Sequence, residues 1–343
     1  MVSRRTLLTL PVPVALGAAL ASCGGSSTAP SGGEGGGSTP ITLQAGYENN
    51  PGEPIDLAMN KWSELLAEKS GGTMRMDIYP SSQLGSKKDL IDQMIAGSPV
   101  ITLADGAFYA DMGVPDFGIV FGPFLFDTWD DAWRLTQSDW YAEQSALLEN
   151  QGVRILTSKW KYGDRHLLIN RSIDSVDGLK GLKVRVPNNL IQIKGFEAMG
   201  ATPTPMALGE VYTALQTGTI DGLENPLPVL YNGRFQEVAK YLILTGHVRN
   251  FTTWITGTAT FNALSDEQKQ WLTETGDEAG VFNNEKQDLV FDETLQKMKD
   301  EGVTVLDLDI NEFKQKAQSF YSMDEVTKNW TPGLYDTVRA AMK

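Results

Sequence analysis

Beyond residue 40 the chain alternates between short apolar segments and longer segments whose apolar residues recur with helical spacing. Ile41–Gly46 is predicted as a strand and Pro54–Ser70 as a helix. Alternating apolar and polar residues over Met74–Ile78 predict a second strand, and Ser86 is placed to cap a second helix. With a buried strand at Val100–Leu103, this β-α-β-α-β opening predicts a parallel, doubly wound sheet of the α/β class.

A second run of the same kind follows. The predicted elements are a helix at Thr128–Gln151, strands at Val153–Trp160, Asp164–Asn170 and Leu182–Val186, helices at Asn188–Met199 and Ala207–Thr217, a strand at Thr219–Leu223, a helix at Pro226–Lys240 and a strand at Tyr241–Leu244. The remainder is mainly helical, with a long polar-faced stretch over Ser265–Gly302 and a terminal helix from Ile310. No repeat of fixed period occurs, which excludes solenoids and propellers.

The first 40 residues differ from the rest. Arg4 and Arg5 precede an apolar run that is too short and too rich in proline to span a membrane, which predicts a signal peptide over 1–22. That run ends at Leu20-Ala21-Ser22-Cys23, which resembles a bacterial lipobox, so Cys23 is the expected site of lipidation. A plain signal peptide is the alternative, and the adjacent arginines leave both Sec and twin-arginine export open. Residues 23–40 predict a flexible, Gly- and Ser-rich tether after the lipidated cysteine.

The amino-acid composition limits which kinds of ligand and partner the protein can have. About 300 residues remain, enough for two α/β domains, and a single cysteine allows no internal disulfide. Without the two arginines of the signal, 27 basic residues face 43 acidic ones, a net charge of −16. This acidity argues against nucleic acid and anionic lipid as partners. Because charges beyond about 8–10 Å are screened, an anionic ligand would have to be recognised by a few arginines inside a cleft.

Little in the sequence supports an enzyme. His166 and His247 are the only histidines, and they have no metal-ligand spacing. A P-loop, a nucleophile elbow and a dinucleotide fingerprint are all absent from the sequence. We therefore expect neither a metal nor a cofactor, and a binding function is favoured.

Arg185 stands at the end of a predicted strand, where Pro187 stops the strand and Asn188 can cap the next helix. In open α/β sheets ligands bind beyond the carboxyl ends of strands, where helix N-termini favour anions. An arginine there presents a planar fork that matches a carboxylate. Taken alone, an arginine in a strand–turn–helix segment is more often a surface residue, so the neighbouring motifs have to decide.

Those motifs form an ordered set. They are Ile78–Gly85, Gly163–Arg165, Arg185–Asn188, Gly200–Met206, Gly209–Gly218 and Ile220–Pro226. Together they resemble the DctP family, the substrate-binding proteins of tripartite ATP-independent periplasmic (TRAP) transporters. The resemblance covers most of the chain after the predicted tether.

The resemblance implies a two-domain fold similar to type II periplasmic binding proteins, with a central ligand cleft and a long interdomain helix. The implied boundaries are 41–162 plus 251–290 for domain I, 163–250 plus 291–330 for domain II, and 331–343 for a C-terminal tail. It also implies two partners in the membrane, one small and one large integral subunit, driven by an ion gradient. We expect a monomer, lipid-anchored at the outer face of the cytoplasmic membrane.

The resemblance also implies the principal site residues. The arginine that pairs with the substrate carboxylate falls on Arg185, and a second cleft arginine falls on Arg165. The asparagine that hydrogen-bonds the ligand falls on Asn225, whose alternative role is to cap the helix after Pro226.

Sialic-acid-binding relatives point to three further positions. Asp105 matches a glutamate that contacts substrate hydroxyls, and Glu48 falls where those relatives have an asparagine. Asn188 matches an asparagine in them and is expected either to touch the ligand or to cap a helix. Two or three of five aromatic residues are expected to wall the cleft: Trp160, Tyr231, Tyr162, Phe108 and Trp254.

The expected function is capture of a small carboxylate for uptake. Two arginines opposite acidic groups suit a hydroxylated acid such as a uronate, an aldonate or a sialic-acid-like sugar. C4-dicarboxylates, keto acids and aromatic acids remain open, while Lys183 disfavours ectoine because relatives that bind it carry an aromatic residue there. The alternatives are a lipoprotein that presents a carboxylate to a sensing receptor and, more remotely, a hydrolase of carboxylated sugars.

Overall fold

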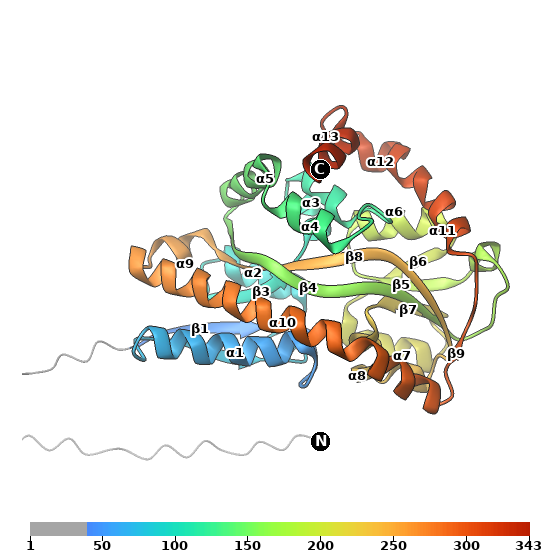
Figure 1. Cartoon of the computed structure of the whole chain (residues 1–343), viewed down its shortest axis with the longest axis horizontal. Coiled ribbons are helices and arrows are strands. Elements are labelled where there is room, and N and C mark those ends of the chain that lie inside the picture. The colour runs from blue at the N-terminus through green and yellow to red at the C-terminus, as the bar shows by residue number, and fades with distance from the viewer. Residues whose placement is uncertain (1–39) are drawn as a thin grey trace, which may run out of the picture. The chain divides into compact units, whose positions relative to one another are not determined.

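The structure is a computed structural model that describes residues 40–343. In this part of the chain nine strands form one sheet, in the order β2-β1-β3-β8-β4-β7-β5-β6, with β9 paired to β8. Figure 1 shows the long strands of the sheet crossing the middle of the molecule and helices on either side. The predicted signal peptide, the lipobox with Cys23 and the tether up to residue 39 lie outside the described residues.

The first strand group opens the sheet as the sequence predicts. It comprises β1 (Ile41–Gly46), β2 (Met74–Tyr79) and β3 (Val100–Ala104), with α1 (Pro54–Lys69) and α2 (Lys87–Ile95) between them. Strand β1 pairs in parallel with both β2 and β3. Ser86 caps α2 through a capping box, since its hydroxyl accepts from Asp89 N and the Asp89 carboxylate accepts from Ser86 N.

The second strand group lies at the other end of the sheet. It comprises β5 (Lys183–Val186), β6 (Thr202–Pro205) and β7 (Gly222–Asn225), and β5 pairs in parallel with both neighbours. Its helical segments are η2 (Val176–Leu179), α6 (Leu190–Met199), η3 (Leu208–Glu210), α7 (Val211–Gln216), α8 (Leu227–Asn232) and η4 (Phe235–Glu237). The predicted helices at 207–217 and 226–240 are therefore each split into an α-helical and a 3₁₀ segment.

Two strands of 17 residues join the groups, β4 (Val153–Ile169) and β8 (Tyr241–Gly257). They pair antiparallel with each other, β8 pairs antiparallel with β3, and β4 with β7. The sheet is thus mixed: the parallel pairing predicted from the opening strands is confirmed there, and the two long central strands add antiparallel pairs that the sequence did not indicate. Register shifts near Trp160, Gly163 and Arg165 interrupt the alternation of side chains, which is why one long strand resembled two short ones in sequence.

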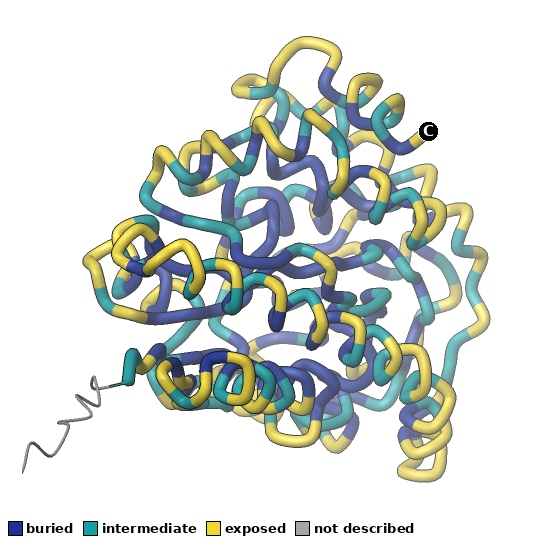
Figure 2. Tube along the Cα trace, turned by 60° about the vertical axis from the view of Figure 1, so that its left-hand side comes forward, coloured by how far each residue is buried: buried dark blue, intermediate teal, exposed yellow. Residues whose placement is uncertain are grey.

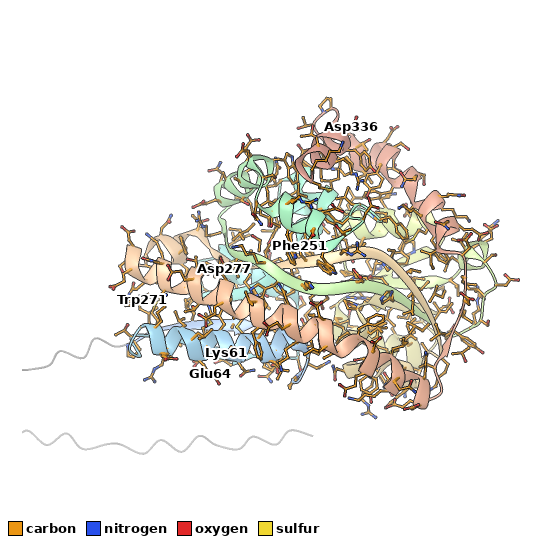
Figure 3. The ribbon with its side chains drawn as sticks, in the orientation of Figure 1. Lys61, Glu64, Phe251, Trp271, Asp277 and Asp336 are labelled. Carbon is orange, nitrogen blue, oxygen red and sulfur yellow. The ribbon has the colours of Figure 1, made fainter. Side chains whose placement is uncertain are left out.

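Helix α10 (Asp266–Asp300) is the long helix that the sequence predicts, and it runs beside α1 and β4 in Figure 1. Its Gly276 and Gly280 face tryptophan rings, where an added Cβ would lie 2.7 Å from Trp62 and 2.9 Å from Trp160. The two glycines therefore allow the helix to pack closely on the aromatic core. Figure 3 shows Asp277 on the same helix, and its carboxylate accepts from the Thr157 hydroxyl of β4 at 2.6 Å.

The remaining helical elements cover the central strands. They are α3 (Gly106–Asp111), η1 (Pro115–Phe121), α4 (Trp129–Thr136), α5 (Asp139–Asn150), α9 (Thr258–Asn262), α11 (Ile310–Ala317), η5 (Gln318–Ser322), α12 (Asp324–Thr327) and α13 (Leu334–Ala341), and the short strand β9 (Thr304–Val305) follows α10. The predicted helix at 128–151 is two helices because Ser138 caps α5 by accepting from Tyr141 N.

The segment predicted as a tail, 331–343, contains α13, whose Leu334 and Val338 are buried in the core. Figure 2 shows buried residues concentrated in the interior of the molecule and exposed residues on the outer turns of the helices. Within residues 40–343 no helix is both long and apolar enough to cross a membrane.

Candidate ligand-binding site

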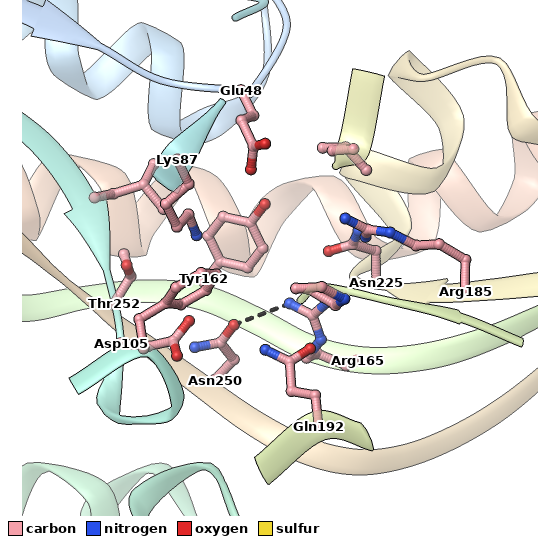
Figure 4. Close-up of a pocket in the computed structure, with 14 residues that line it drawn as sticks. Glu48, Lys87, Asp105, Tyr162, Arg165, Arg185, Gln192, Asn225, Asn250 and Thr252 are labelled. Carbon is pink, nitrogen blue, oxygen red and sulfur yellow. Dashed lines mark hydrogen bonds between the residues drawn. The ribbon is translucent and has the colours of Figure 1, made fainter. Parts of the chain in front are cut away.

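A small cavity lies between the two strand groups, over the middle of β4 and β8. Its polar walls come from segments far apart in sequence (Figure 4). They are Glu48, Lys87, Asp105, Tyr162, Arg165, Arg185, Gln192, Asn225, Asn250 and Thr252. Glu48 and Asp105 follow β1 and β3, while Arg185 and Asn225 lie near the ends of β5 and β7. The cavity therefore sits at the carboxyl ends of the parallel strands, where ligands bind in open α/β sheets.

Arg185 presents a buried positive charge to this cavity. Its side chain is 2% exposed, and its Nε and Nη2 donate to the Met206 carbonyl at 2.9 and 2.7 Å. No carboxylate oxygen of residues 40–343 lies within 4.0 Å of the guanidinium. Burial lowers the pKa of Arg185, but a guanidinium stays charged in proteins. The result is a charged fork with free donors and no anionic partner from the described chain.

Arg165 has a different environment, because its charge is paired inside the protein. Its Nη2 donates to Glu224 Oε1 at 2.6 Å, its Nε donates to Glu224 Oε2, and its Nη1 donates to Asn250 Oδ1 at 3.1 Å. His247 Nε2 lies 3.2 Å from the same Glu224 carboxylate. Burial alone would raise the pKa of Glu224, but Arg165 and His247 outweigh it and lower that pKa to about 2. The pair therefore forms a neutral, fixed floor for the cavity.

Two buried amide oxygens in the second strand group have no hydrogen-bond partner in the described structure. They are Asn225 Oδ1 and Gln192 Oε1, and both side chains line the cavity. The alternative role for Asn225 as a helix cap is not observed, since no side chain caps α8. Buried polar atoms are rarely left unpaired, so these acceptors are available to donors of a ligand or of water.

The first strand group contributes carboxylates and an ammonium. Asp105 is buried and caps α3 by accepting from Ala107 N at 3.1 Å. Burial raises its pKa, opposed by the positive charges of Lys87 and Arg165. Glu48 is half-buried above the cavity, and Lys87 reaches in from the first residue of α2.

Comparison with known proteins identifies the family of this chain. The sequence model of the bacterial extracellular solute-binding proteins of family 7, the DctP family, matches residues 45–327. The chain belongs to this family.

Individual relatives of this DctP-family protein agree. It is 31% identical to the sialic acid-binding periplasmic protein SiaP of Vibrio cholerae, over 82% of this chain and 87% of that one. A TRAP periplasmic solute-binding protein of Ochrobacterium anthropi, solved with bound L-fuconate, is 41% identical with a TM-score of 0.86, over 89% of this chain and all of that one. One from Actinobacillus succinogenes, solved with L-galactonate, is 36% identical with a TM-score of 0.84, over 88% and 99%.

The cavity of this DctP-family protein gathers five of the eight predicted ligand contacts. These are Arg185, Arg165, Asn225, Asp105 and Glu48. Asn188 is exposed and lines a wider outer pocket that opens beside the cavity. The cap of α6 is its neighbour Asn189, which accepts from Gln192 N at 2.9 Å, so Asn188 does not cap this helix.

The other two predicted contacts lie away from the cavity. Trp160 is packed in the core with Trp62 and Trp254, at ring distances between 5.3 and 6.0 Å, and donates to Gly276 O at 3.0 Å. Tyr231 sits at the end of α8, where its hydroxyl donates to Glu301 at 2.7 Å. Of the five aromatic candidates, the cavity is lined by Tyr162 and Phe108.

Sequence reasoning missed four polar residues of the cavity: Lys87, Gln192, Asn250 and Thr252. Asn250 and Thr252 became recognisable only with the full length of β8, which places them opposite Gly163 and Trp160. Gln192 is the third residue of α6, which begins at Leu190 after the cap Asn189, and its side chain faces the cavity. Lys87 had one signal, its place directly after the cap Ser86.

Proposed function

We propose that this protein is the extracytoplasmic solute-binding component of a TRAP transporter and that its cavity binds a hydroxylated monocarboxylate of the sugar-acid class. The observation that carries the proposal is Arg185, a buried guanidinium directed into a cavity without a carboxylate partner in residues 40–343. The related structures that hold L-fuconate and L-galactonate support the ligand class, since both ligands are six-carbon aldonates.

The free hydrogen-bonding groups match such a ligand. A guanidinium has five N–H donors, and Arg185 uses two on Met206, which leaves three for a carboxylate. The unpaired oxygens of Asn225 and Gln192 can accept from hydroxyls near the acid group. Burial in a site that excludes water strengthens each of these contacts relative to the surface.

We also propose that the site closes by rotation of two domains, 41–162 plus 251–290 against 163–250 plus 291–330. The proposed boundary crosses β4 and β8 between the pairs Lys161↔Phe251 and Gly163↔Asn250, where the register shifts. Gly163 has φ of +126°, a conformation that favours glycine and departs from regular strand geometry.

Helix α10 supports that position for the pivot. Asn284 Oδ1 accepts from Lys161 N at 2.7 Å, and Asn283 Nδ2 and Gln287 Nε2 donate to the carbonyls of Lys161 and Tyr162 at 2.8 and 3.0 Å. These bonds fix β4 to the helix up to the residue before Gly163. We expect the chain beyond to rotate about Gly163 when the domains close.

A thermal-shift screen against organic acids and their neutral analogues tests the proposed function. A ligand at about 100 times its dissociation constant adds roughly 2.7 kcal/mol and should raise the melting temperature by several degrees. We expect aldonates to stabilise the protein and the corresponding alditols, which lack the carboxylate, to have no effect. The same acid should lower the radius of gyration in small-angle scattering if the domains close. Stabilisation by alditols would contradict carboxylate capture.

We further propose that the protein is exported and anchored to the membrane through lipidated Cys23, and that it works as a monomer with separate small and large membrane subunits. The support is the segment Leu20-Ala21-Ser22-Cys23 and a family whose members are extracellular solute-binding proteins. Expressed in a bacterial host, the protein should sediment with membranes and carry a diacylglyceryl mass on Cys23, while Cys23→Ser should not. An unmodified Cys23 in protein recovered from the membrane fraction would contradict the anchor.

A further inference from the structure

Lys87 occupies a position that local structure disfavours. It is the first residue of α2, where the partial positive charge of the helix N-terminus repels a cation. Burial lowers its pKa, as do Arg165 and Arg185, while Asp105 and Glu48 oppose this. No carboxylate oxygen of residues 40–343 lies within 4.0 Å of its Nζ, which lies 4.7 Å from the Phe108 ring centroid.

The adjacent residue, Lys88, is a useful comparison because its side chain points away from the cavity. Lys88 is exposed, and its Nζ forms an ion pair with Asp92 at 2.5 Å, one turn along α2. The Lys87 side chain instead points into the cavity and forms no ion pair with residues 40–343 (Figure 4). A partly buried charge that is held without an ion pair in the wall of a ligand cavity is typical of a functional position.

The cavity is divided by the chemistry of its walls. In Figure 4, Arg185 and Asn225 lie on one side, and Lys87 and Asp105 on the other, with Glu48 above them. A carboxylate bound at Arg185 would therefore place the far end of its carbon chain beside the ammonium and the two acidic groups.

That combination of groups selects a hydroxyl. Ionised Glu48 and Asp105 only accept hydrogen bonds, whereas the ammonium of Lys87 only donates them. A hydroxyl can satisfy both, because it accepts from the ammonium and donates to a carboxylate. An entirely apolar tail satisfies neither, and a second carboxylate on the ligand would face two negative charges with no proton to donate.

We propose that Lys87 is a specificity-determining residue that binds hydroxyls at the end of the ligand remote from Arg185. The inference rests on the proposed function and assigns recognition of the ligand's hydroxylated tail to one side chain. It also explains how two acidic side chains can lie beside an anionic ligand: Lys87 supplies the positive charge that offsets them.

The test is calorimetric titration of the wild type, Lys87→Met and the matched control Lys88→Met with three ligands. L-Galactonate has the acid and the hydroxylated tail, 2-hydroxyhexanoate has the acid with an apolar tail, and galactarate adds a second carboxylate. We expect Lys87→Met to weaken galactonate binding about 10- to 100-fold, the range for losing a charge-assisted hydrogen bond, and to leave 2-hydroxyhexanoate within threefold. Lys88→Met should bind all three as the wild type does, and the wild type should prefer galactonate to galactarate.

The ligand-free melting temperature separates binding from folding. Because Lys87 sits unfavourably at a helix N-terminus, Lys87→Met should melt at the same temperature as the wild type or higher. Equal galactonate affinity in wild type and Lys87→Met would overturn the inference while the proposed function stands. Galactarate bound as tightly as galactonate would overturn it too, by assigning Lys87 to a second carboxylate. A wild type that binds no sugar acid at all would overturn the proposed function and the inference with it.

Discussion

Replacing Arg185 with alanine should weaken binding of the preferred acid by about 2–5 kcal/mol, or roughly 30- to several-thousand-fold. The guanidinium is buried and has no carboxylate partner in the described structure, so the carboxylate of the ligand would be its counter-ion. Without it, that carboxylate would be buried in the cavity with no guanidinium to offset its charge. Calorimetric titration with the acid that stabilises best in the thermal-shift screen measures the loss.

Two further variants make this result specific. Arg185→Lys should also bind weakly, because an ammonium cannot make the two parallel hydrogen bonds of a guanidinium. Arg171→Ala, which removes an exposed arginine two residues after β4, should bind as the wild type does. The ligand-free stability of Arg185→Ala should change little, since the loss of two bonds to Met206 is offset by the removal of a buried charge. A loss of affinity under threefold would remove Arg185 from the site.

Local sequence predicts the elements that depend on local interactions. The cap at Ser86 predicted α2, and the helical spacing of apolar residues predicted α1. The proline after Val186 marked the end of β5, as expected. Strands β4 and β8 were recognised only in pieces, because their register shifts break the alternation on which a strand prediction depends. Their antiparallel pairing is a non-local property that no segment carries by itself.

The same limit applies to the site. Arg185 was predictable because the end of a parallel strand has one usual function in this class of sheet. The sequence could not show which of Trp160 and Tyr162 lines the cavity, since both lie on β4 two residues apart. That spacing moves the side chain about 6–7 Å along the strand, which is enough to pass from the core under α10 to the cavity. The packing of other elements decides where along a strand the cleft lies. It also decides which way the Lys87 side chain points.

Breaking the buried Arg165–Glu224 pair should destabilise the protein by about 3–5 kcal/mol at pH 7, because Glu224→Gln leaves the Arg165 charge buried without its counter-ion. Urea denaturation measures the loss. The double variant Arg165→Met with Glu224→Gln should recover much of the stability, since it removes the unpaired charge. Glu293→Gln, which breaks the exposed pair with Lys297, is the matched control and should leave the denaturation midpoint unchanged.

The stability difference between wild type and Glu224→Gln should depend on pH in one direction. Glu224 has a folded pKa of about 2 against an ordinary value of 4.5, so its contribution is fully present above pH 4.5 and is lost as the pH falls toward 2. The loss amounts to about 3 kcal/mol, and the Gln variant, which has no proton to gain at this position, should not show it. The two denaturation curves should therefore converge between pH 4.5 and pH 2. A difference that stays constant over that range would mean that Glu224 is not held ionised by Arg165, and the neutral floor of the cavity would have to be abandoned.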